Sequence, residues 1–438
     1  MKRKLIPACA LGIVALMATA CGPTETYTVG VNLNYALLIG QIDHNDSAAR
    51  TGGVRDALNT RAENPTSNAN TENPVVGTLT VGGKTLTVTE VEHAEQRNTA
   101  GTAWDATTAT NTTANWLAAH ANDTWVKEDG SETKGQGINI FVSNNDGMAM
   151  AAINANGWVK GTPIFGYDAN TDALEAIVEG KLMGTVSQNA PTQVASLLML
   201  TRNLIDDVEN PTTTGFSAET PNTTYGYVTQ TTNYNSTHHS ILADNVAVDS
   251  AEEARQWLLT PAEQVSTFEG SIKNGNKATD NRIFLNCYSN SDTFLNSTMS
   301  PLFQALLPMF DLTTGATGST AYTVSGDGNT DTTITNNLTT VSDAYLLNII
   351  TPTAASQYLN TIAQLEGASA TNPSDKPIIF WNRQPTKADG SVDTDIINDE
   401  RFTNIYYVGF DANQGGEAQG QMVLDYITAN ISTLWSRI

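Results

Sequence analysis

Polar side chains that can hold a ligand gather in one heptapeptide and at the ends of four short apolar runs. The heptapeptide, His44 to Arg50, reads HNDSAAR. The runs are INIFVSNND, TPIFGYDAN, NRIFLNCYSNSDTF and AYLLNIITP, and they carry Asn145, Asp168, Asp292 and Asn348. Carboxylates and a guanidinium make charge-assisted hydrogen bonds, whereas amides both donate and accept. This mixture suits a ligand with hydroxyl groups around its rim.

A hexopyranose is such a ligand, and its C–H faces pack on flat aromatic rings such as Trp104 and Phe294. Each of these residues also has an ordinary structural explanation. A single Asp or Asn after a strand is commonly a turn residue or a helix cap, and a single Trp is commonly part of the core. Only the joint pattern favours a sugar site.

The order of the predicted elements places these residues together. Short apolar runs alternate with helical patterns, which indicates an α/β protein with parallel sheets. In such sheets, ligands bind beyond the carboxyl ends of the strands, where the polar residues stand. Helices are expected over Thr171–Glu179, Ala190–Asp206, Ala354–Leu365 and Gln414–Asn430. Surface loops are expected in the polar tracts Asn59–Asn73, Asn210–Tyr225, Asp311–Asn337 and Thr386–Arg401.

The amino terminus has the layout of an export signal. A basic start is followed by the apolar stretch Leu5–Ala20 and then by Cys21. This apolar stretch is short for a membrane span and typical of a signal peptide. A cysteine directly after small residues resembles a bacterial lipobox, which predicts acylation of Cys21; a plain cleaved signal is the alternative. With Cys21 acylated, only Cys287 would remain, so no intramolecular disulfide is expected.

Composition limits the class of partner. The chain has 438 residues and a formal net charge of −23. The length suggests two or three domains, and the negative charge argues against nucleic acid or an anionic membrane surface as a partner. No later stretch is apolar for long enough to span a membrane.

Several segments resemble one known family. The segments SNNDGMAMAAINA (Ser143–Ala155) and PIFGYDANTDALEAIVEGKLMGTV (Pro163–Val186) resemble the carboxyl-terminal half of the periplasmic galactose/glucose-binding protein family. The preceding GQIDHNDSAART and TAWDATTATNTTANWL resemble earlier segments of that half. RIFLNCYSNSDTFLNS, LLNIITPTAA, PIIFWNRQP and YYVGFDANQGGEAQGQMV resemble the amino-terminal half, yet they come later in this chain. The resemblance therefore implies a circular permutation, as in the permuted glucose-binding lipoproteins of this family.

The resemblance implies a type I periplasmic-binding-protein fold, with two Rossmann-like lobes, a ligand cleft and a hinge. It implies no catalytic residue and no cofactor. Carried over by position, the sugar-binding residues are His44, Asp46, Arg50, Trp104, Asn145, Asp168, Gln188, Asp292, Phe294 and Asn348. Gln188 stands where the family has Asn, which changes the reach of that amide.

The resemblance also assigns the parts of the chain. The expected parts are a signal peptide at 1–21, a first lobe at 25–190 completed by about 240–258 and 411–438, a crossover helix and insertion at 191–238 packing on the second lobe, a permutation connector at 259–280, and a second lobe at 281–410. The calcium loop of many relatives is not continuous here, and Asn139 stands at its distant Glu position, so no calcium is expected. The DGNTD sequence at 327–331 lacks the glycine and glutamate of a calcium loop.

The function expected from the resemblance is that of an exported solute-binding lipoprotein of an ABC sugar importer. It would bind glucose, galactose or both, deliver the sugar to the permease subunits, and work as a monomer held at the membrane only by its lipid. Two alternatives stay open. One is a sugar-sensing receptor component, and the other is a glycosidase that uses two of the carboxylates of Asp46, Asp168 and Asp292.

Overall fold

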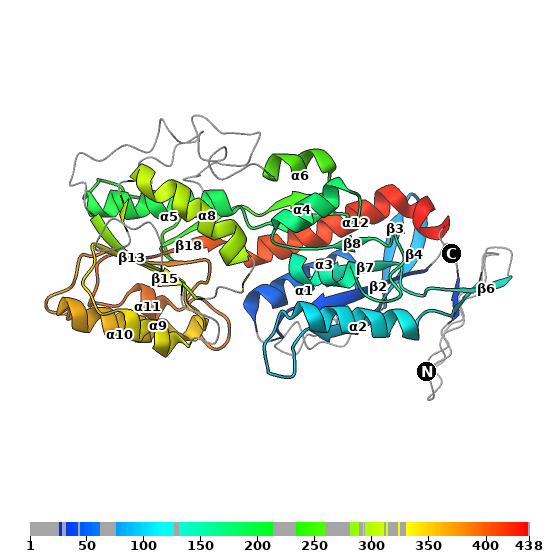
Figure 1. The fold of residues 1–438 in the computed structure, drawn as a ribbon, viewed down its shortest axis with the longest axis horizontal. Coiled ribbons are helices and arrows are strands. Elements are labelled where there is room, and N and C mark those ends of the chain that lie inside the picture. The colour runs from blue at the N-terminus through cyan, green and yellow to red at the C-terminus, as the bar shows by residue number, and fades with distance from the viewer. Residues whose placement is uncertain are drawn as a thin grey trace, which may run out of the picture. The chain divides into compact units, whose positions relative to one another are not determined.

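The computed structural model divides the chain into two compact units (Figure 1). Unit 1 comprises residues up to Val186, Ala247–Ala254 and Ala412–Ile438, and unit 2 comprises Ser187–Val246 and Arg255–Asp411. The structure describes residues 26–28, 32–42, 44–61, 76–126, 131–212, 234–258, 281–288, 292, 294–310, 312–313, 323–324 and 330–436.

Unit 1 is built on a five-stranded sheet in the order β3-β4-β2-β7-β8. The strands are β2 (Asn32–Ile39), β3 (Val76–Val81), β4 (Lys84–Glu95), β7 (Ile140–Ser143) and β8 (Ile164–Phe165). All neighbours are parallel except β3 and β4. That pair is a hairpin turned by Gly82 and Gly83, whose φ angles of 57° and 78° suit glycine.

Helices cover both faces of the unit 1 sheet. They are α1 (Asn45–Ala57), α2 (Ala106–Ala119), α3 (Asp146–Ile153), α4 (Thr171–Val178) and α12 (Ala412–Ser436). Val54 of α1 and Val423 of α12 share one core with alternate residues of β2, such as Leu37. The helices α1 and α12 pack closely, since a Cβ on Gly53 would lie 2.1 Å from the Gly416 carbonyl. The helix α1 is thereby held against α12.

Smaller elements complete unit 1. A three-stranded sheet joins β1 (Thr26–Thr28), β5 (Asp123–Val126) and β6 (Glu132–Gly135), and β9 (Thr185–Ser187) pairs with β12 (Val246–Val248). The helix α6 spans Ala251–Trp257. Two backbone hydrogen bonds, Gly166 N to Gly184 O and Asp168 N to Val186 O, hold the start of β9 and the residue before it beside the end of β8.

Unit 2 has an eight-stranded sheet whose main path is β10-β11-β18-β17-β16-β13-β14, with β15 also on β13. The strands are β10 (Tyr234–Asn235), β11 (Ser240–Ala243), β13 (Asn281–Cys287), β14 (Leu312–Thr313), β15 (Thr323–Val324), β16 (Ala344–Leu347), β17 (Ile378–Trp381) and β18 (Ile405–Phe410). All pairs along this path are parallel except β10–β11. Apolar runs such as IIFW in β17 are buried on both faces, as parallel strands are.

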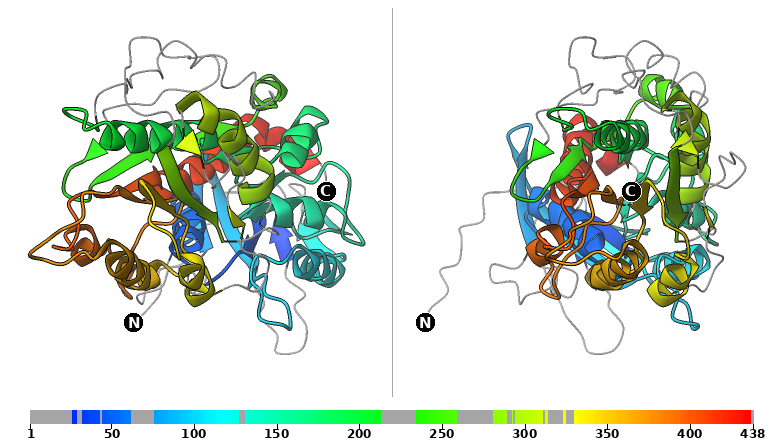
Figure 2. Two further views of the ribbon diagram at one scale, coloured as in Figure 1. Left: turned by 60° about the vertical axis from the view of Figure 1, so that its left-hand side comes forward. Right: turned by 90° about the vertical axis from the view of Figure 1, so that its left-hand side faces the viewer.

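Helices also cover both faces of the unit 2 sheet (Figure 2). The core of one face includes α5 (Ala190–Ile205), α8 (Ser300–Leu306) and the π-helical turn Phe294–Met299. The core of the other includes α9 (Asp331–Asn337), α10 (Ala355–Glu366) and α11 (Thr394–Ile397). Short 3-10 turns occupy Leu307–Phe310 and Pro352–Ala354.

The α/β class, the two lobes and the four expected helices are confirmed, although α12 begins earlier and extends further than Gln414–Asn430. Three expected domain boundaries differ from the structure, one of them because residues 255–258 lie in unit 2 rather than in the first lobe. Residues 240–246 belong to unit 2, because β11 forms four parallel residue pairs with β18, and unit 2 begins at Ser187 rather than after residue 190. Within the expected loops Asp311–Asn337 and Thr386–Arg401, the structure has the short helices α9 and α11. The signal peptide and the 259–280 connector lie outside the described residues.

Candidate functional site

The sheet of unit 1 reverses its strand order at one place. From β2 the chain first adds β4 on one side and later β7 on the other, so a switch point lies between β2 and β7. Ligands of open α/β sheets bind outside the carboxyl ends of the strands at such a point. There the Gly40 amide donates to Asn144 Oδ1 at 3.1 Å, which ties the two strand ends together.

Arg50 is the buried cation of this region. Only 4% of the residue is exposed, and its Nη1 donates to the Asn144 carbonyl at 2.7 Å and lies 3.5 Å from Asp168 Oδ1. The guanidinium carbon lies 3.6 Å from the centre of the Tyr167 ring, a cation–π distance. Burial lowers the pKa of Arg50, but Asp168 together with Tyr167, Asp46 and Asp146 outweighs this and raises it. The buried Nε finds no hydrogen-bond partner among the described residues.

His44 and Asp46 lie at the start of α1, and Trp104 lies beside them. His44 caps the helix, since its Nδ1 accepts from the Asp46 amide at 3.3 Å, and the same nitrogen lies 3.8 Å from Asp46 Oδ2. The His44 ring meets the Trp104 ring edge-on at 5.8 Å, and the Arg50 guanidinium lies 5.6 Å from the Trp104 ring centre. The Trp104 backbone has a φ of 60°, and a Cβ on Gly40 would lie 2.1 Å from its ring.

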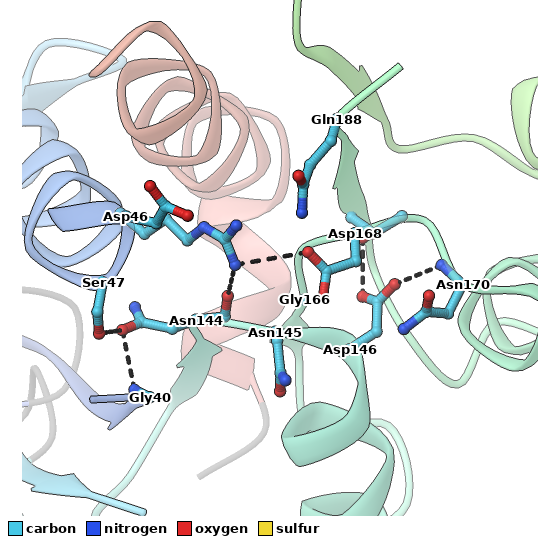
Figure 3. A network of polar contacts seen from close by, with 12 residues as sticks. Gly40, Asp46, Ser47, Asn144, Asn145, Asp146, Gly166, Asp168, Asn170 and Gln188 are labelled. Atoms are coloured by element: carbon cyan, nitrogen blue, oxygen red, sulfur yellow. Dashed lines mark hydrogen bonds and ion pairs between the residues drawn. The ribbon is translucent and has the colours of Figure 1, made fainter. Parts of the chain in front are cut away.

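Asn145 and Asp168 follow β7 and β8. Asn145 caps α3 by accepting from the Met148 amide at 2.9 Å. Asp168 is 7% exposed and has a φ of 115°, a conformation rare outside glycine. Asn144, Asn145 and Asp168 lie close together in unit 1 (Figure 3), and the Asp168 carboxylate shares Arg50 with the Asn144 carbonyl.

Asn144 is a site residue that the sequence reasoning missed. Its Oδ1 accepts from Gly40 N, from Ser47 Oγ at 2.6 Å and from Thr51 Oγ1 at 3.3 Å, so it fixes α1 to the end of β7. Its buried Nδ2 has no hydrogen-bond partner among the described residues. The doubled asparagine of SNND was the available signal, because both amides follow a strand and precede a helix.

In unit 2, Asp292 stands just before the turn that begins at Phe294. Its Oδ1 accepts from the Leu295 amide at 3.0 Å, and its Oδ2 accepts from the Tyr288 hydroxyl at 2.9 Å. Phe294 is 6% exposed and belongs to the core cluster that includes Leu295 and Met299. Asp292 thus caps this helical turn, which is the ordinary structural role of an Asp after a strand.

Asn348 is completely buried beyond the end of β16. Its Oδ1 accepts from the Tyr288 amide at 3.2 Å, its Nδ2 donates to the Trp381 carbonyl at 3.3 Å, and its backbone pairs with the Asn286 side chain. This residue ties the ends of β13, β16 and β17 together.

Gln188 lies in unit 2 and accepts through Oε1 from Asn382 Nδ2 at 3.5 Å. Asn382 follows β17, is half-buried and has a φ of 62°. The neighbouring Arg383 donates to the Tyr288 hydroxyl at 2.6 Å and to the Ile350 carbonyl, with its guanidinium 4.2 Å from the Tyr288 ring centre. Asn382 and Arg383 therefore join the strand-end polar groups of unit 2. The sequence reasoning missed both, although they stand in the quoted PIIFWNRQP.

The structure thus divides the ten predicted residues between the units. Unit 1 brings together His44, Asp46, Arg50, Trp104, Asn145 and Asp168, and unit 2 holds Gln188, Asp292, Phe294 and Asn348. Within the described ranges, no group of three or more His, Cys, Asp or Glu side chains is placed to hold a metal ion. Asn139 instead accepts from the Asn34 amide at 2.8 Å, and Asp331 of the DGNTD sequence begins α9. Among the described residues, no helix is both long and apolar enough to cross a membrane.

Comparison with known proteins gives partial matches. A segment of 93 residues is 40% identical to the D-galactose/methyl-galactoside binding periplasmic protein MglB of Haemophilus influenzae, covering 20% of this chain and 27% of MglB. The chain therefore spans about a quarter of that relative's length.

Solved structures are similar over about a third of the chain. An ABC transporter solute-binding protein of Actinobacillus succinogenes, with bound D-allose, is 23% identical over 36% of this chain and 41% of its own, with a TM-score of 0.24. A solute-binding protein of Bacillus halodurans, with bound myo-inositol, is 21% identical over 37% of this chain and 47% of its own, with a TM-score of 0.23.

The family comparison covers most of unit 1 and the first helix of unit 2. Residues 12–209 match the family described as periplasmic binding protein domain, a stretch that contains the switch point between β2 and β7 and every site residue from His44 to Gln188. Residues 12–209 of this chain are therefore similar to the periplasmic binding protein domain.

Proposed function

We propose that this chain is the exported sugar-binding component of an ABC importer and that it binds a hexose at the strand ends that carry the site residues. The pairing of Arg50 with Asp168 carries the proposal. It offers a buried donor, Arg50 Nε, whose partner is not among the described residues, next to a carboxylate that accepts. A buried donor without a partner costs free energy, and a sugar hydroxyl would satisfy it.

The chemistry around that pair fits a monosaccharide. Asp46 and Asp168 accept, Arg50 donates, and His44 and Asn145 can do both. The half-buried Trp104 ring offers an apolar face. In unit 2, Asp292 and Gln188 are the candidates for contact with a sugar, with the Asn382 amide as an additional one, because the Asn348 amide and the Phe294 ring are already used within that unit. The similarity to MglB favours galactose as the sugar, and the family resemblance noted in the sequence adds glucose.

Calorimetry on the protein without its first 21 residues tests this function, with glucose, galactose, allose and ribose as ligands. We expect saturable binding of a hexose and weaker binding of ribose, because a pentose leaves a site hydroxyl contact unmade at a cost of about 1–3 kcal/mol. Absence of binding by any hexose at millimolar concentration would contradict the proposal. Hydrolysis of a glycoside that is lost on mutating one Asp would point to the glycosidase instead.

We also propose that the two halves of the family's chain are in swapped order here and that Cys21 carries a lipid anchor. In unit 2, β11 precedes β13 in the chain but pairs at the opposite side of the sheet, on β18. After β18 the chain returns to unit 1 as α12, which packs on α1. This connectivity is what joining the old ends of the family's chain near residues 259–280 would produce.

A reordered variant tests the permutation. Residues 281–438 would come first, followed by a flexible linker and then residues 26–258, and a folded protein with unchanged hexose affinity is expected. An insoluble or non-binding product would count against the permuted order, provided the parent chain binds. Incorporation of labelled palmitate, lost in Cys21→Ala, tests the anchor separately.

A further inference from the structure

The carboxyl group of Asp146 links three strand ends of unit 1. Its residue follows Asn145 at the end of β7, and the side chain is completely buried. Oδ2 accepts from the Asn170 amide at 2.8 Å, and Oδ1 accepts from the Thr185 hydroxyl of β9 at 2.7 Å. A Cβ on Gly166, at the end of β8, would lie 2.1 Å from Oδ1, so the carboxyl occupies the space that this glycine leaves open.

These contacts surround a strained turn. Asp168 has a φ of 115° and Ala169 a φ of 55°, conformations that cost about 1–3 kcal/mol each outside glycine and persist only where neighbouring contacts fix them. Here the Thr185 hydroxyl that donates to Asp146 also accepts from the Ala169 amide at 3.2 Å, and Asp168 N donates to Val186 O at 2.8 Å. Hydrogen bonds therefore hold the amides of residues 168, 169 and 170 in turn.

We propose that Asp146 is a positioning residue for the sugar site: it holds the 168–170 turn so that the Asp168 carboxylate faces Arg50, and it touches no ligand itself. Figure 3 shows Asp146 between Asp168 and Asn170. Arg50 Nη1 donates to Asp168 Oδ1 at 3.5 Å. The inference rests on the proposed function, in which Asp168 accepts from a sugar hydroxyl. It gives a role to the last residue of the strand-end run INIFVSNND, which the ten predicted site residues do not include.

The test substitutions remove single links of this network. Asp146→Asn keeps the shape but puts an NH2 group in place of one acceptor oxygen, so either Asn170 N loses its acceptor or the Thr185 hydroxyl must accept where it now donates. Thr185→Val removes the shared hydroxyl, and Gly166→Ala pushes a methyl group against Oδ1. Val88→Ala, a buried residue of β4 in the unit 1 core, is the matched control, because it lowers stability without touching the turn.

A double-mutant cycle separates positioning from general destabilisation. We expect Asp146→Asn to weaken hexose binding about 10-fold, Asp168→Ala to weaken it more, and the double variant to bind no more weakly than Asp168→Ala alone. Val88→Ala should lower the Tm without changing affinity. Additive losses from Asp146→Asn and Asp168→Ala, or an unchanged affinity in Asp146→Asn, would overturn the positioning role.

Amide hydrogen exchange, measured without ligand, tests the role of Asp146 independently of the proposed sugar binding. In Asp146→Asn, amide hydrogen exchange at Ala169 and Asn170 should quicken relative to the wild type, while exchange in Val88→Ala rises at the strands around β4 and not at the turn. If the wild type binds no hexose, the proposed function is wrong. The role of Asp146 in the turn is then tested by amide hydrogen exchange alone. Unchanged exchange at residues 168–170 would overturn that role whatever the ligand.

Discussion

The predicted site residues fall into two halves, one in each unit, and the two halves differ in how their polar groups are used. In unit 1, Arg50 is held by Asn144, Asp168 and Tyr167 while one of its donors has no partner among the described residues. In unit 2, both the oxygen and the nitrogen of the Asn348 amide are hydrogen-bonded to backbone groups, and Phe294 belongs to the core. Polar residues at strand ends are therefore of two kinds, those that leave hydrogen-bonding capacity for a ligand and those that tie the strands together.

The largest effect that distinguishes the halves is expected at Arg50. Arg50→Ala should weaken hexose binding about 100-fold or more, since it removes a buried charged donor and leaves Asp168 without its cation. Asn348→Ala should chiefly lower the Tm, because its side chain joins three strand ends. Calorimetry and thermal unfolding of both variants check this. Equal losses of affinity in the two would erase the distinction between the halves.

A second large effect concerns the support of α1. Arg55 and Glu90 form a completely buried ion pair with bonds of 2.7 and 2.8 Å, and Tyr35 donates to the same carboxylate at 2.6 Å. Arg55→Met should cost about 3–5 kcal/mol of unfolding free energy by removing the buried guanidinium that pairs with that carboxylate. Denaturant unfolding measures it. A loss no larger than that of an exposed pair, tested in Lys387→Met, would show that the network does not hold α1.

The same ion pair makes the stability of the fold depend on pH in the acid range. Burial opposes the charge of Glu90, but hydrogen bonds from Arg55 and His93 lower its pKa from 4.5 to about 2. Because the folded-state pKa is depressed, the stabilisation is present above 4.5 and is lost as the pH falls through about 2. Glu90→Gln should remove this dependence, which thermal unfolding between pH 2 and pH 6 would reveal. An unaltered pH profile would contradict the assignment.

A smaller effect is expected at Gly40, which lies against Trp104. A methyl group there would fall 2.1 Å from the indole ring, so Gly40→Ala should shift Trp104 and weaken hexose binding about 3–10-fold with little change in Tm. Gly147→Ala is the control, since a Cβ there has nothing closer than 3.9 Å. Full affinity in Gly40→Ala would mean that the ring position does not matter to the sugar.

The smallest effect is a pH dependence away from the strand ends. Burial lowers the pKa of His120, but its contacts with Asp123 at 2.8 Å and Glu92 at 3.2 Å outweigh this and raise it from 6.5 to about 9. Since the folded-state pKa is raised, the stabilisation is complete below 6.5 and is lost as the pH rises through about 9. His120→Gln should flatten the Tm between pH 7 and pH 10, with hexose affinity unchanged. Affinity that followed the titration would link this cluster to the site.

The sequence predicted the layout of the molecule better than its site. Apolar runs and helical periodicity located the elements, because both are local properties of the chain. The side of the sheet on which β11 pairs depends on contacts distant in sequence, so residues 240–246 were assigned to the wrong lobe.

The strand ends were found for the same local reason, but the use of each side chain was not. Nothing in the sequence distinguishes Asn348, which ties three strands, from Asn382, which lies half-buried beside Gln188. The role of Asp146 depends on the positive φ angles of Asp168 and Ala169, and the side-chain types at these two positions do not predict such a conformation.

A crystal structure of the protein with glucose or galactose tests the central claim most directly. We expect one hexose with a hydroxyl on Arg50 Nε, a second hydroxyl on the Asp168 carboxylate and the Trp104 ring against a C–H face of the sugar. A hexose bound elsewhere, or at this place with Arg50 Nε still without a partner, would contradict the account.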